Sequence, residues 1–104
     1  MGAFGQPSYG ASKAGLVGLT RSLALEGARH NITVNTVLPG FIETEAVKLQ
    51  SPDILERYKK RTAMKRLGGP EEVASLVLYL VSEKASYITG AAIPVAGGAD
   101  LLTF

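Results

Sequence analysis

The 104-residue sequence contains no cysteine, so disulfide bonds and thiolate metal sites are excluded. Its single histidine, His30, cannot form a histidine cluster around a metal ion, and we expect it to lie solvated near a helix end. No apolar run approaches the ~18 residues of a membrane-spanning helix. Residues 1–6 lack the basic region and apolar core of a signal peptide. We therefore expect a cytoplasmic protein with no metal site and no membrane partner.

The net charge of +2 is mild, and basic residues concentrate in only one segment. They are Arg57, Lys59, Lys60, Arg61, Lys65 and Arg66. Nucleic-acid-binding proteins usually carry a concentrated basic stripe, whereas this segment is flanked by Glu56, Glu71 and Glu72. The pattern favours a solvated helix face over a nucleic-acid site, and we expect no nucleic-acid partner.

Hydrophobic spacing predicts a first helix over residues 9–28, with Ser8 as its N-cap. Gly10, Gly15 and Gly18 lie inside this helix, where each costs roughly 1 kcal/mol relative to alanine. Close approach of another backbone is the usual compensation for such a cost. We therefore expect the face that carries Gly10, Ala14 and Gly18 to pack against a sheet or another helix.

Two short strands are predicted, over residues 32–38 and 91–96, because β-branched and apolar residues there end at Pro39-Gly40 and at Gly97-Gly98. Residues 41–51 have only weak helical character. Ser51 and Pro52 resemble an N-cap and the first residue of a helix over 52–62.

Pro70 opens a further amphipathic helix. Its expected buried stripe is Val73, Leu76, Val77 and Leu80. The order helix, strand, helices, strand predicts an α/β fold with a parallel strand pair joined by a right-handed crossover. Parallel sheets normally have more than two strands and are covered on both faces, so these residues indicate part of a larger sheet.

Tyr9 and Lys13 are four residues apart on the first predicted helix, so their side chains share one face. An ammonium beside a phenol favours the phenolate and lowers the phenol pKa from about 10 towards working pH. Such a tyrosine donates a proton to a carbonyl oxygen, or removes one from an alcohol. A single Tyr-x-x-x-Lys match is weak, because it is common by chance and a surface pair explains an isolated match better.

The surrounding sequence makes the match specific. The segments SYGASKAG (8–15), LTRSLALE (19–26), ITVNTVLPG (32–40), RLGGPEEVA (66–74) and YITG (87–90), with Thr44, resemble the short-chain dehydrogenase/reductase family. The resemblance covers essentially the whole chain and is closest to bacterial 3-oxoacyl-acyl-carrier-protein reductases. It implies the carboxy-terminal portion of a Rossmann-like doubly wound parallel sheet, and reversible hydride transfer between NAD or NADP and a carbonyl or alcohol substrate.

The resemblance also implies roles for individual positions. Tyr9 is the expected general acid and base and also an expected cofactor contact. Lys13 is expected to assist it and to hydrogen-bond the nicotinamide ribose. The remaining expected cofactor contacts are Pro39, Gly40, the backbone of Ile42, and the hydroxyl and amide of Thr44. An ordinary strand-ending turn and a loop hydroxyl are the structural alternatives for these positions. Asn35 is interpreted as structural, bonding neighbouring backbone.

Within this pattern, residues 1–42 form the catalytic helix and following strand, 43–69 a substrate lid, and 70–104 the final helix and strand. Val47, Leu49, Met64 and Leu67 are candidates either for an apolar substrate pocket or for packing within the lid. Pro94 and residues 99–104 depart from the reductase pattern. The expected substrate is therefore a carbonyl or alcohol compound, with an acyl thioester as the narrower candidate.

The Gly-rich phosphate loop of a dinucleotide-binding half is absent from these 104 residues, as are the family's catalytic serine and its residue that selects NAD or NADP. We therefore expect a fragment that holds half of an active site. The family also implies a homo-oligomer. The alternative function is a catalytically inactive module for oligomerisation or interaction.

Overall fold

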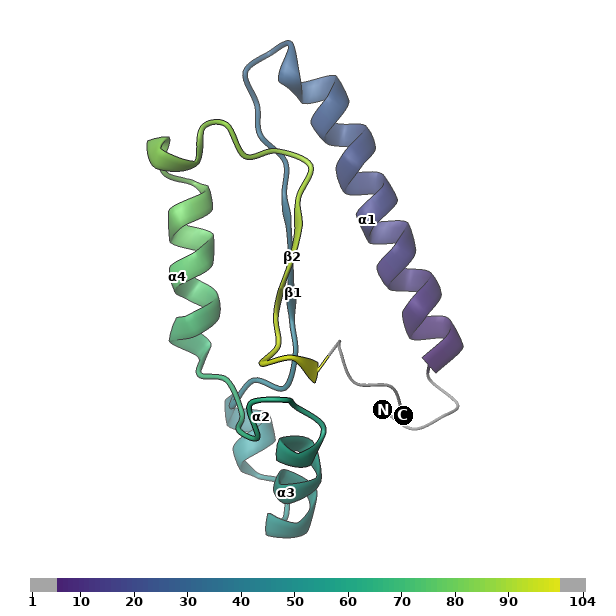
Figure 1. Ribbon diagram of the computed structural model, residues 1–104, viewed down its shortest axis with the longest axis vertical. Helices are drawn as coiled ribbons and strands as arrows, with labels where there is room; N and C mark the ends of the chain where they lie inside the picture. Colours follow the sequence, from purple (N-terminus) through teal and green to yellow (C-terminus); the bar gives the residue numbers. More distant parts are fainter. Residues whose placement is uncertain (1–5, 100–104) are drawn as a thin grey trace. The chain divides into compact units, whose positions relative to one another are not determined.

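The computed structural model describes residues 6–99, which form the helices and strands of Figure 1. The chain divides into two compact units. Unit 1 comprises the residues up to Thr36 together with Ser82–Ile93, and unit 2 comprises Val37–Val81 together with the residues from Pro94 onward. None of the helices in the described part of the chain is long and apolar enough to cross a membrane.

Helix α1 (Gln6–Ala28) belongs to unit 1 and begins three residues earlier than the sequence predicts. Ser8 therefore lies inside the helix, and its prediction as the N-cap is wrong. Pro7 is compatible with the earlier start, because the N–H groups of a first turn have no helical partner. At the other end, the Ile32 N–H donates to the Gly27 carbonyl, and Asn31 adopts a φ of 59°. The helix ends at Ala28, as predicted, and the left-handed Asn31 follows in the turn after it.

The glycine face of α1 does not pack as predicted. A Cβ placed on Gly10, Gly15 or Gly18 would meet no described atom within 4 Å. The side chains that α1 buries are instead those of Thr20 and Ala24. The spacing of the small residues predicts a face of α1 that another backbone could approach closely. In the described part of the chain, no second backbone lies against that face.

Strands β1 (Thr36–Pro39) and β2 (Ala92–Val95) form a two-stranded sheet. The Thr36 N–H donates to the Ala91 carbonyl at 2.8 Å, and the Gly40 N–H donates to the Val95 carbonyl at 3.0 Å. Partner numbers rise together along both strands, so the pair is parallel, as predicted. β1 is shorter than the predicted strand, because a side chain rather than a strand partner accepts from the Val34 N–H.

The Asn35 side chain bonds the backbone of the segment that precedes β2. Its Nδ2 donates to the Ile88 carbonyl at 3.1 Å, and its Oδ1 accepts from the Ala91 N–H at 3.0 Å. The Val34 N–H donates to the Thr89 hydroxyl at 3.0 Å. The prediction that Asn35 bonds backbone is therefore confirmed.

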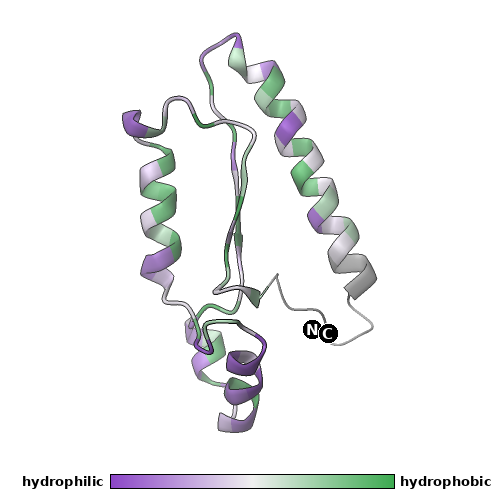
Figure 2. Cartoon of the chain, viewed as in Figure 1, coloured by the Kyte–Doolittle hydropathy of each residue, from purple (hydrophilic) through white to green (hydrophobic). Residues whose placement is uncertain are grey.

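Unit 2 contains three α-helices, namely α2 (Glu45–Lys48), α3 (Pro52–Lys60) and α4 (Pro70–Leu80). A 3₁₀ turn (Glu83–Ala85) follows in unit 1. The Ser51 hydroxyl accepts from the Ile54 N–H and caps α3, as predicted from the Ser-Pro pair. Figure 2 shows that α3 is largely hydrophilic. Pro70 begins α4, as predicted.

The expected buried stripe of α4 is only partly formed. Val73, Leu76 and Leu80 are half-buried, whereas Val77 is 43% exposed. Helical spacing predicts which side of α4 is apolar, but burial requires a partner layer. The described part of the chain covers only part of that side.

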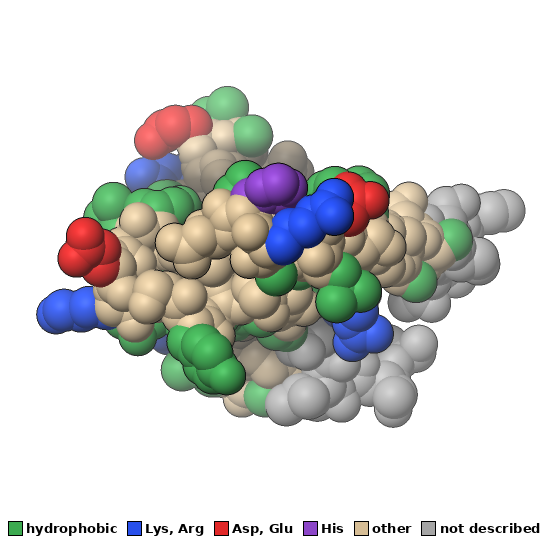
Figure 3. All heavy atoms as spheres, turned by 90° about the horizontal axis from the view of Figure 1, so that it is seen from above, with side chains coloured by type: hydrophobic (Ala, Val, Ile, Leu, Met, Phe, Trp, Pro, Cys, Tyr) green, Lys and Arg blue, Asp and Glu red, His purple; other side chains and the backbone are tan. Residues whose placement is uncertain are grey.

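The buried hydrophobic core is correspondingly small. Ala24 and Ala85 are its apolar members, and Thr20, Thr36 and Thr62 are buried polar residues. Many large apolar side chains are exposed, and Tyr87 is 100% exposed. Figure 3 shows hydrophobic side chains scattered among polar ones on the face seen from above. Exposed apolar surface of this extent is typical of a chain that packs against further protein.

Candidate cofactor site

The loop that follows β1 is held closely against the end of β2 within unit 2. A Cβ on Gly40 would lie 2.7 Å from the Ala96 Cβ and 2.8 Å from the Ala96 Cα. Only glycine permits this approach, because a side chain would collide with backbone. Pro39 is the last residue of β1 and is exposed. The Pro-Gly pair therefore ends the strand and brings residues 41–44 to its carboxyl edge.

Ile42 forms an isolated parallel bridge with Gly68. In this bridge the Gly68 N–H donates to the Phe41 carbonyl at 2.9 Å, and the Glu43 N–H donates to the Gly68 carbonyl at 2.8 Å. Gly68 thus bonds both neighbours of Ile42, and the N–H and C=O of Ile42 point to the opposite side. The Ile42 carbonyl accepts from the Thr44 N–H, but the Ile42 N–H has no hydrogen-bond partner among residues 6–99.

Thr44 is the N-cap of α2, and its hydroxyl oxygen accepts from the Val47 N–H at 3.3 Å. Its own N–H is engaged with Ile42 at 2.8 Å. The hydroxyl proton of Thr44 is the group left to donate to a ligand. The open hollow beside it is lined by three carboxylates, those of Glu43, Glu45 and Glu71, and by Lys48.

An aromatic stack attaches α3 to the same loop. The rings of Phe41 and Tyr58 lie 5.0 Å apart and nearly parallel, with an angle of 17°. The Arg61 guanidinium carbon lies 5.4 Å from the centre of the Phe41 ring. The prediction that Arg61 belongs to a solvated helix face is therefore wrong. Sequence reasoning did not identify this stack, because the two rings are brought together only by folding.

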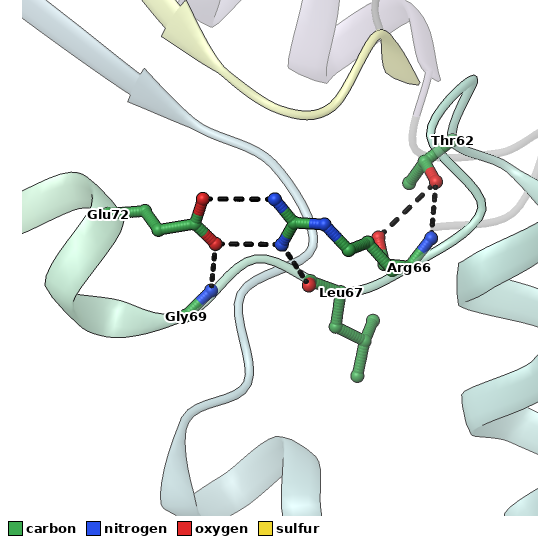
Figure 4. Close-up of polar contacts among 5 residues, drawn as sticks. All are labelled: Thr62, Arg66, Leu67, Gly69 and Glu72. Atoms are coloured by element: carbon green, nitrogen blue, oxygen red, sulfur yellow. Dashed lines mark hydrogen bonds and ion pairs between the residues drawn. The ribbon is translucent and has the colours of Figure 1, made fainter.

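Arg66 is exposed, as predicted, but it lies outside the helices and is paired with Glu72 (Figure 4). Its two terminal nitrogens donate to the two oxygens of Glu72, at 2.8 Å and 3.0 Å, and it also donates to the Leu67 carbonyl. Glu72 accepts a further bond from the Gly69 N–H at 2.9 Å. The Arg66 hydrogen bonds, followed by the Gly69 N–H, lower the pKa of Glu72 to about 2 from its usual 4.5.

This cluster fixes the turn at which residues 43–69 join α4. Glu72 is the third residue of α4, and its carboxylate accepts from the N–H of the N-cap residue Gly69, as in a capping box. The reciprocal bond of a capping box is missing, because glycine has no side chain. A glutamate three residues after Gly69 is the signal in the sequence that points to this cap.

A cavity of about 240 Å³ lies beside Ile42 in unit 2. Its walls combine the loop, the end of β2 and the Arg66–Glu72 pair. They are formed by Phe41, Ile42, Met64, Arg66, Gly68, Glu72 and residues 94–97. Met64 therefore lines a cavity, whereas Leu49 is exposed and Val47 and Leu67 are half-buried.

Tyr9 and Lys13 both lie in α1, as the sequence predicts. The Lys13 side chain is half-buried, whereas the side chain of Tyr9 lies outside the described part of the chain. These two residues belong to unit 1, and the loop from Gly40 to Thr44 belongs to unit 2. His30 is exposed just after α1, as expected. Among residues 6–99, no group of three or more potential ligands is placed to hold a metal ion.

Comparison with known proteins agrees with this architecture. The family model described as enoyl-(acyl carrier protein) reductase matches residues 1–100. The chain belongs to the short-chain dehydrogenase/reductase family. It is 53% identical over 97 residues to the 3-oxoacyl-[acyl-carrier-protein] reductase of Aquifex aeolicus, covering 93% of this chain and 39% of that protein. It is 45% identical over 97 residues to the acetoacetyl-CoA reductase of Acinetobacter, again covering 93% and 39%.

Among solved structures, this short-chain dehydrogenase/reductase is similar to the NADPH-dependent reductase YwfH of bacilysin biosynthesis. The TM-score is 0.76 at 38% sequence identity, over 83% of this chain and 37% of that one. The chain therefore spans about two fifths of the length of the relatives that it matches.

Proposed function

We propose that this chain provides the proton-transfer pair and part of the cofactor site of an NAD(P)-dependent oxidoreductase. The observation that carries the proposal is the Ile42 N–H, which the bridge with Gly68 turns outward at the carboxyl end of β1 and leaves without a described partner. Ligands of open α/β sheets bind at this edge. A free amide donor there fits the nicotinamide carboxamide, whose oxygen is an acceptor.

The other proposed cofactor contacts are Lys13 on α1, Pro39 and Gly40 at the strand end, and Thr44. For Thr44 we assign the contact to the hydroxyl proton alone, because the Thr44 N–H is already bonded to Ile42. The nicotinamide cofactor is NAD or NADP. NADPH is the first to test, since YwfH is described as NADPH-dependent.

The chemistry assigned to this chain is proton transfer. When bound, the reduced cofactor supplies a hydride to the carbonyl carbon of the substrate. Tyr9 donates its hydroxyl proton to the carbonyl oxygen, so that the carbonyl becomes an alcohol and Tyr9 becomes a phenolate. The ammonium of Lys13, one helical turn away, favours that phenolate. In the reverse direction Tyr9 accepts the proton of the alcohol.

The proposed substrate class is a 3-oxoacyl thioester. The two relatives compared above are named for reductions of 3-oxoacyl-acyl carrier protein and of acetoacetyl-CoA, which share a ketone at carbon 3 of a thioester. Residues 43–69 are assigned as the substrate lid, attached to the loop after β1 by the Phe41–Tyr58 stack. The two strands are assigned to the carboxy-terminal portion of a Rossmann-like sheet, consistent with the likeness to YwfH.

A hybrid protein tests the proposal. The hybrid joins residues 1–104 to the amino-terminal part of the Aquifex aeolicus reductase that this chain does not match. We expect NADPH-dependent reduction of acetoacetyl-CoA by the hybrid. The Tyr9→Phe hybrid should lose at least about 100-fold in kcat, in line with general acid catalysis, while still binding NADPH. Tyr87→Phe is the matched control, because Tyr87 is fully exposed. Near-normal turnover by Tyr9→Phe overturns the assignment.

The exposed apolar side chains support a second candidate function, association with further protein without catalysis. Sedimentation of the 104-residue chain over a range of concentrations distinguishes the two. Stable association together with an inactive hybrid would favour the interaction module. An active hybrid would favour the oxidoreductase.

A further inference from the structure

Thr20 of α1 and Thr36 of β1 form a buried polar contact inside unit 1. Their side chains are 3% and 8% exposed, and their hydroxyl groups are hydrogen-bonded to each other. They are the buried polar residues of the described part of unit 1. A buried hydroxyl requires a partner, so the pair specifies one arrangement of helix and strand.

The direction of the bond follows from a second contact. The Thr20 hydroxyl also lies 2.7 Å from the carbonyl of Leu16, one turn earlier in α1, and donates its proton there. A hydroxyl has one proton, so Thr36 donates to Thr20. The result is a directed chain of two bonds, from Thr36 to Thr20 and from Thr20 to the backbone of α1.

This contact matters because α1 has few others. Of its described side chains, Thr20 and Ala24 are buried, whereas Leu16, Leu19 and Leu23 are 41–55% exposed. A Cβ on Gly90 would lie 3.5 Å from the Ala24 Cβ, so this contact limits how closely α1 approaches. Apolar contacts of this kind have no direction. The hydrogen bond is therefore the contact that sets the rotation of α1 about its axis and its position along that axis.

Lys13 lies seven residues before Thr20, which is close to two helical turns and places both residues on the same face of α1. A rotation or shift of the rigid helix at Thr20 moves Lys13 by a similar amount. We propose that the Thr20–Thr36 bond is a positioning contact that holds Lys13 for its role in proton transfer. This inference rests on the proposed function of Lys13 and goes beyond it, because it assigns a role to two residues outside the site.

Helix position can be measured on the 104-residue chain without any activity. The chain has no cysteine, so spin labels can be attached at cysteines placed at Ser12 and Tyr87, both exposed and both in unit 1. We expect Thr20→Val and the double variant Thr20→Val/Thr36→Val to broaden or shift the distance distribution. Thr20→Ser keeps the hydroxyl and should retain the original distribution. An unchanged distribution in the double variant overturns the inference.

Kinetics of the hybrid link helix position to proton transfer. Thr20→Val leaves the Thr36 hydroxyl buried without an acceptor, which lowers the unfolding temperature, whereas the double variant removes both hydroxyls and should recover much of that loss. If the pair were merely structural, kcat would recover together with stability. We expect instead that kcat stays roughly 10- to 100-fold low in the double variant, since small misplacements cost that much. We also expect an altered pH profile and a nearly unchanged KM.

Thr89→Val is the matched control. It removes the hydrogen bond from the Val34 N–H in the same unit without touching α1, and should leave kcat and the pH profile unchanged. Full kcat in the double variant overturns the inference while leaving the proposed function intact. An active Tyr9→Phe hybrid overturns the proposed function itself.

Discussion

The Glu72 carboxylate is bonded bidentately by the Arg66 guanidinium, at 2.8 Å and 3.0 Å, while it also accepts from the N–H of Gly69. The carboxylate therefore joins the end of the segment before α4 to the first turn of that helix. Because these contacts are stronger to an ionised carboxylate than to the neutral acid, they make the start of α4 sensitive to acid.

The pH dependence follows from the direction of the Glu72 pKa shift. Its folded-state pKa is lowered to about 2 from 4.5, so the contribution of the pair is complete above about 4.5 and is lost as the pH falls towards 2. The Arg66 pKa is raised by the same contacts, so Arg66 stays charged throughout that range. NMR titration of the Glu72 side-chain carboxyl should give a midpoint near 2. In Arg66→Gln the midpoint should rise but stay below 4.5, because the Gly69 bond remains. A midpoint of 4.5 in the unaltered chain would contradict the structure.

Gly40→Ala should destabilise unit 2 by about 1–3 kcal/mol, the usual cost of overpacking. The added Cβ would lie within 2.8 Å of two Ala96 atoms, the Cβ and the Cα, so backbone has to move. Adding Ala96→Gly should restore only part of the loss, since the collision with the backbone of residue 96 persists.

Gly18→Ala is the opposite case. Gly18 lies inside α1 with no described atom near its Cβ position, and the change should stabilise the helix by up to about 1 kcal/mol. Urea unfolding measures both effects.

Asn35→Asp should lower stability by about 1–3 kcal/mol at neutral pH, because a carboxylate cannot donate to the Ile88 carbonyl. The bond from the Ala91 N–H is retained. The Ile88 carbonyl favours the protonated acid, which can still donate to it, whereas the Ala91 N–H favours the carboxylate. The loss should therefore be smaller at pH 3, where more of the acid is protonated, than at pH 7. Urea unfolding at pH 3 and pH 7 measures the difference, and an equal loss at both values would argue against this role.

Phe41→Leu should destabilise unit 2 by about 1 kcal/mol beyond the loss of apolar area, because both the Tyr58 stack and the Arg61 contact disappear. Tyr58→Leu should show coupling to Phe41→Leu in a double-mutant cycle of unfolding free energies. Tyr58→Phe retains the ring and should be nearly neutral. Additive effects of the two leucine substitutions would show that the rings do not interact.

Local sequence signals determined several ends of the elements. Pro39-Gly40 predicted the end of β1, Ser51-Pro52 predicted the start of α3, and Pro70 predicted the start of α4. Each prediction depends on the backbone restrictions of proline and glycine or on a short cap, and these act within a few residues. Family membership was likewise evident from the motifs, and the match over residues 1–100 confirms it.

Tertiary structure alone decided which faces are covered and which polar groups meet. Sequence spacing predicted a packed face around Gly18, but α1 buries Thr20 and Ala24 instead. The side chains of the basic segment are largely exposed, as predicted, but the fold decided that Arg61 lies over Phe41 and that Arg66 bonds Glu72. The Ile42 N–H has no partner among the described residues because of a bridge to Gly68, which is distant in the sequence. Burial and pairing depend on which distant residues the fold brings together, and local spacing carries no such information.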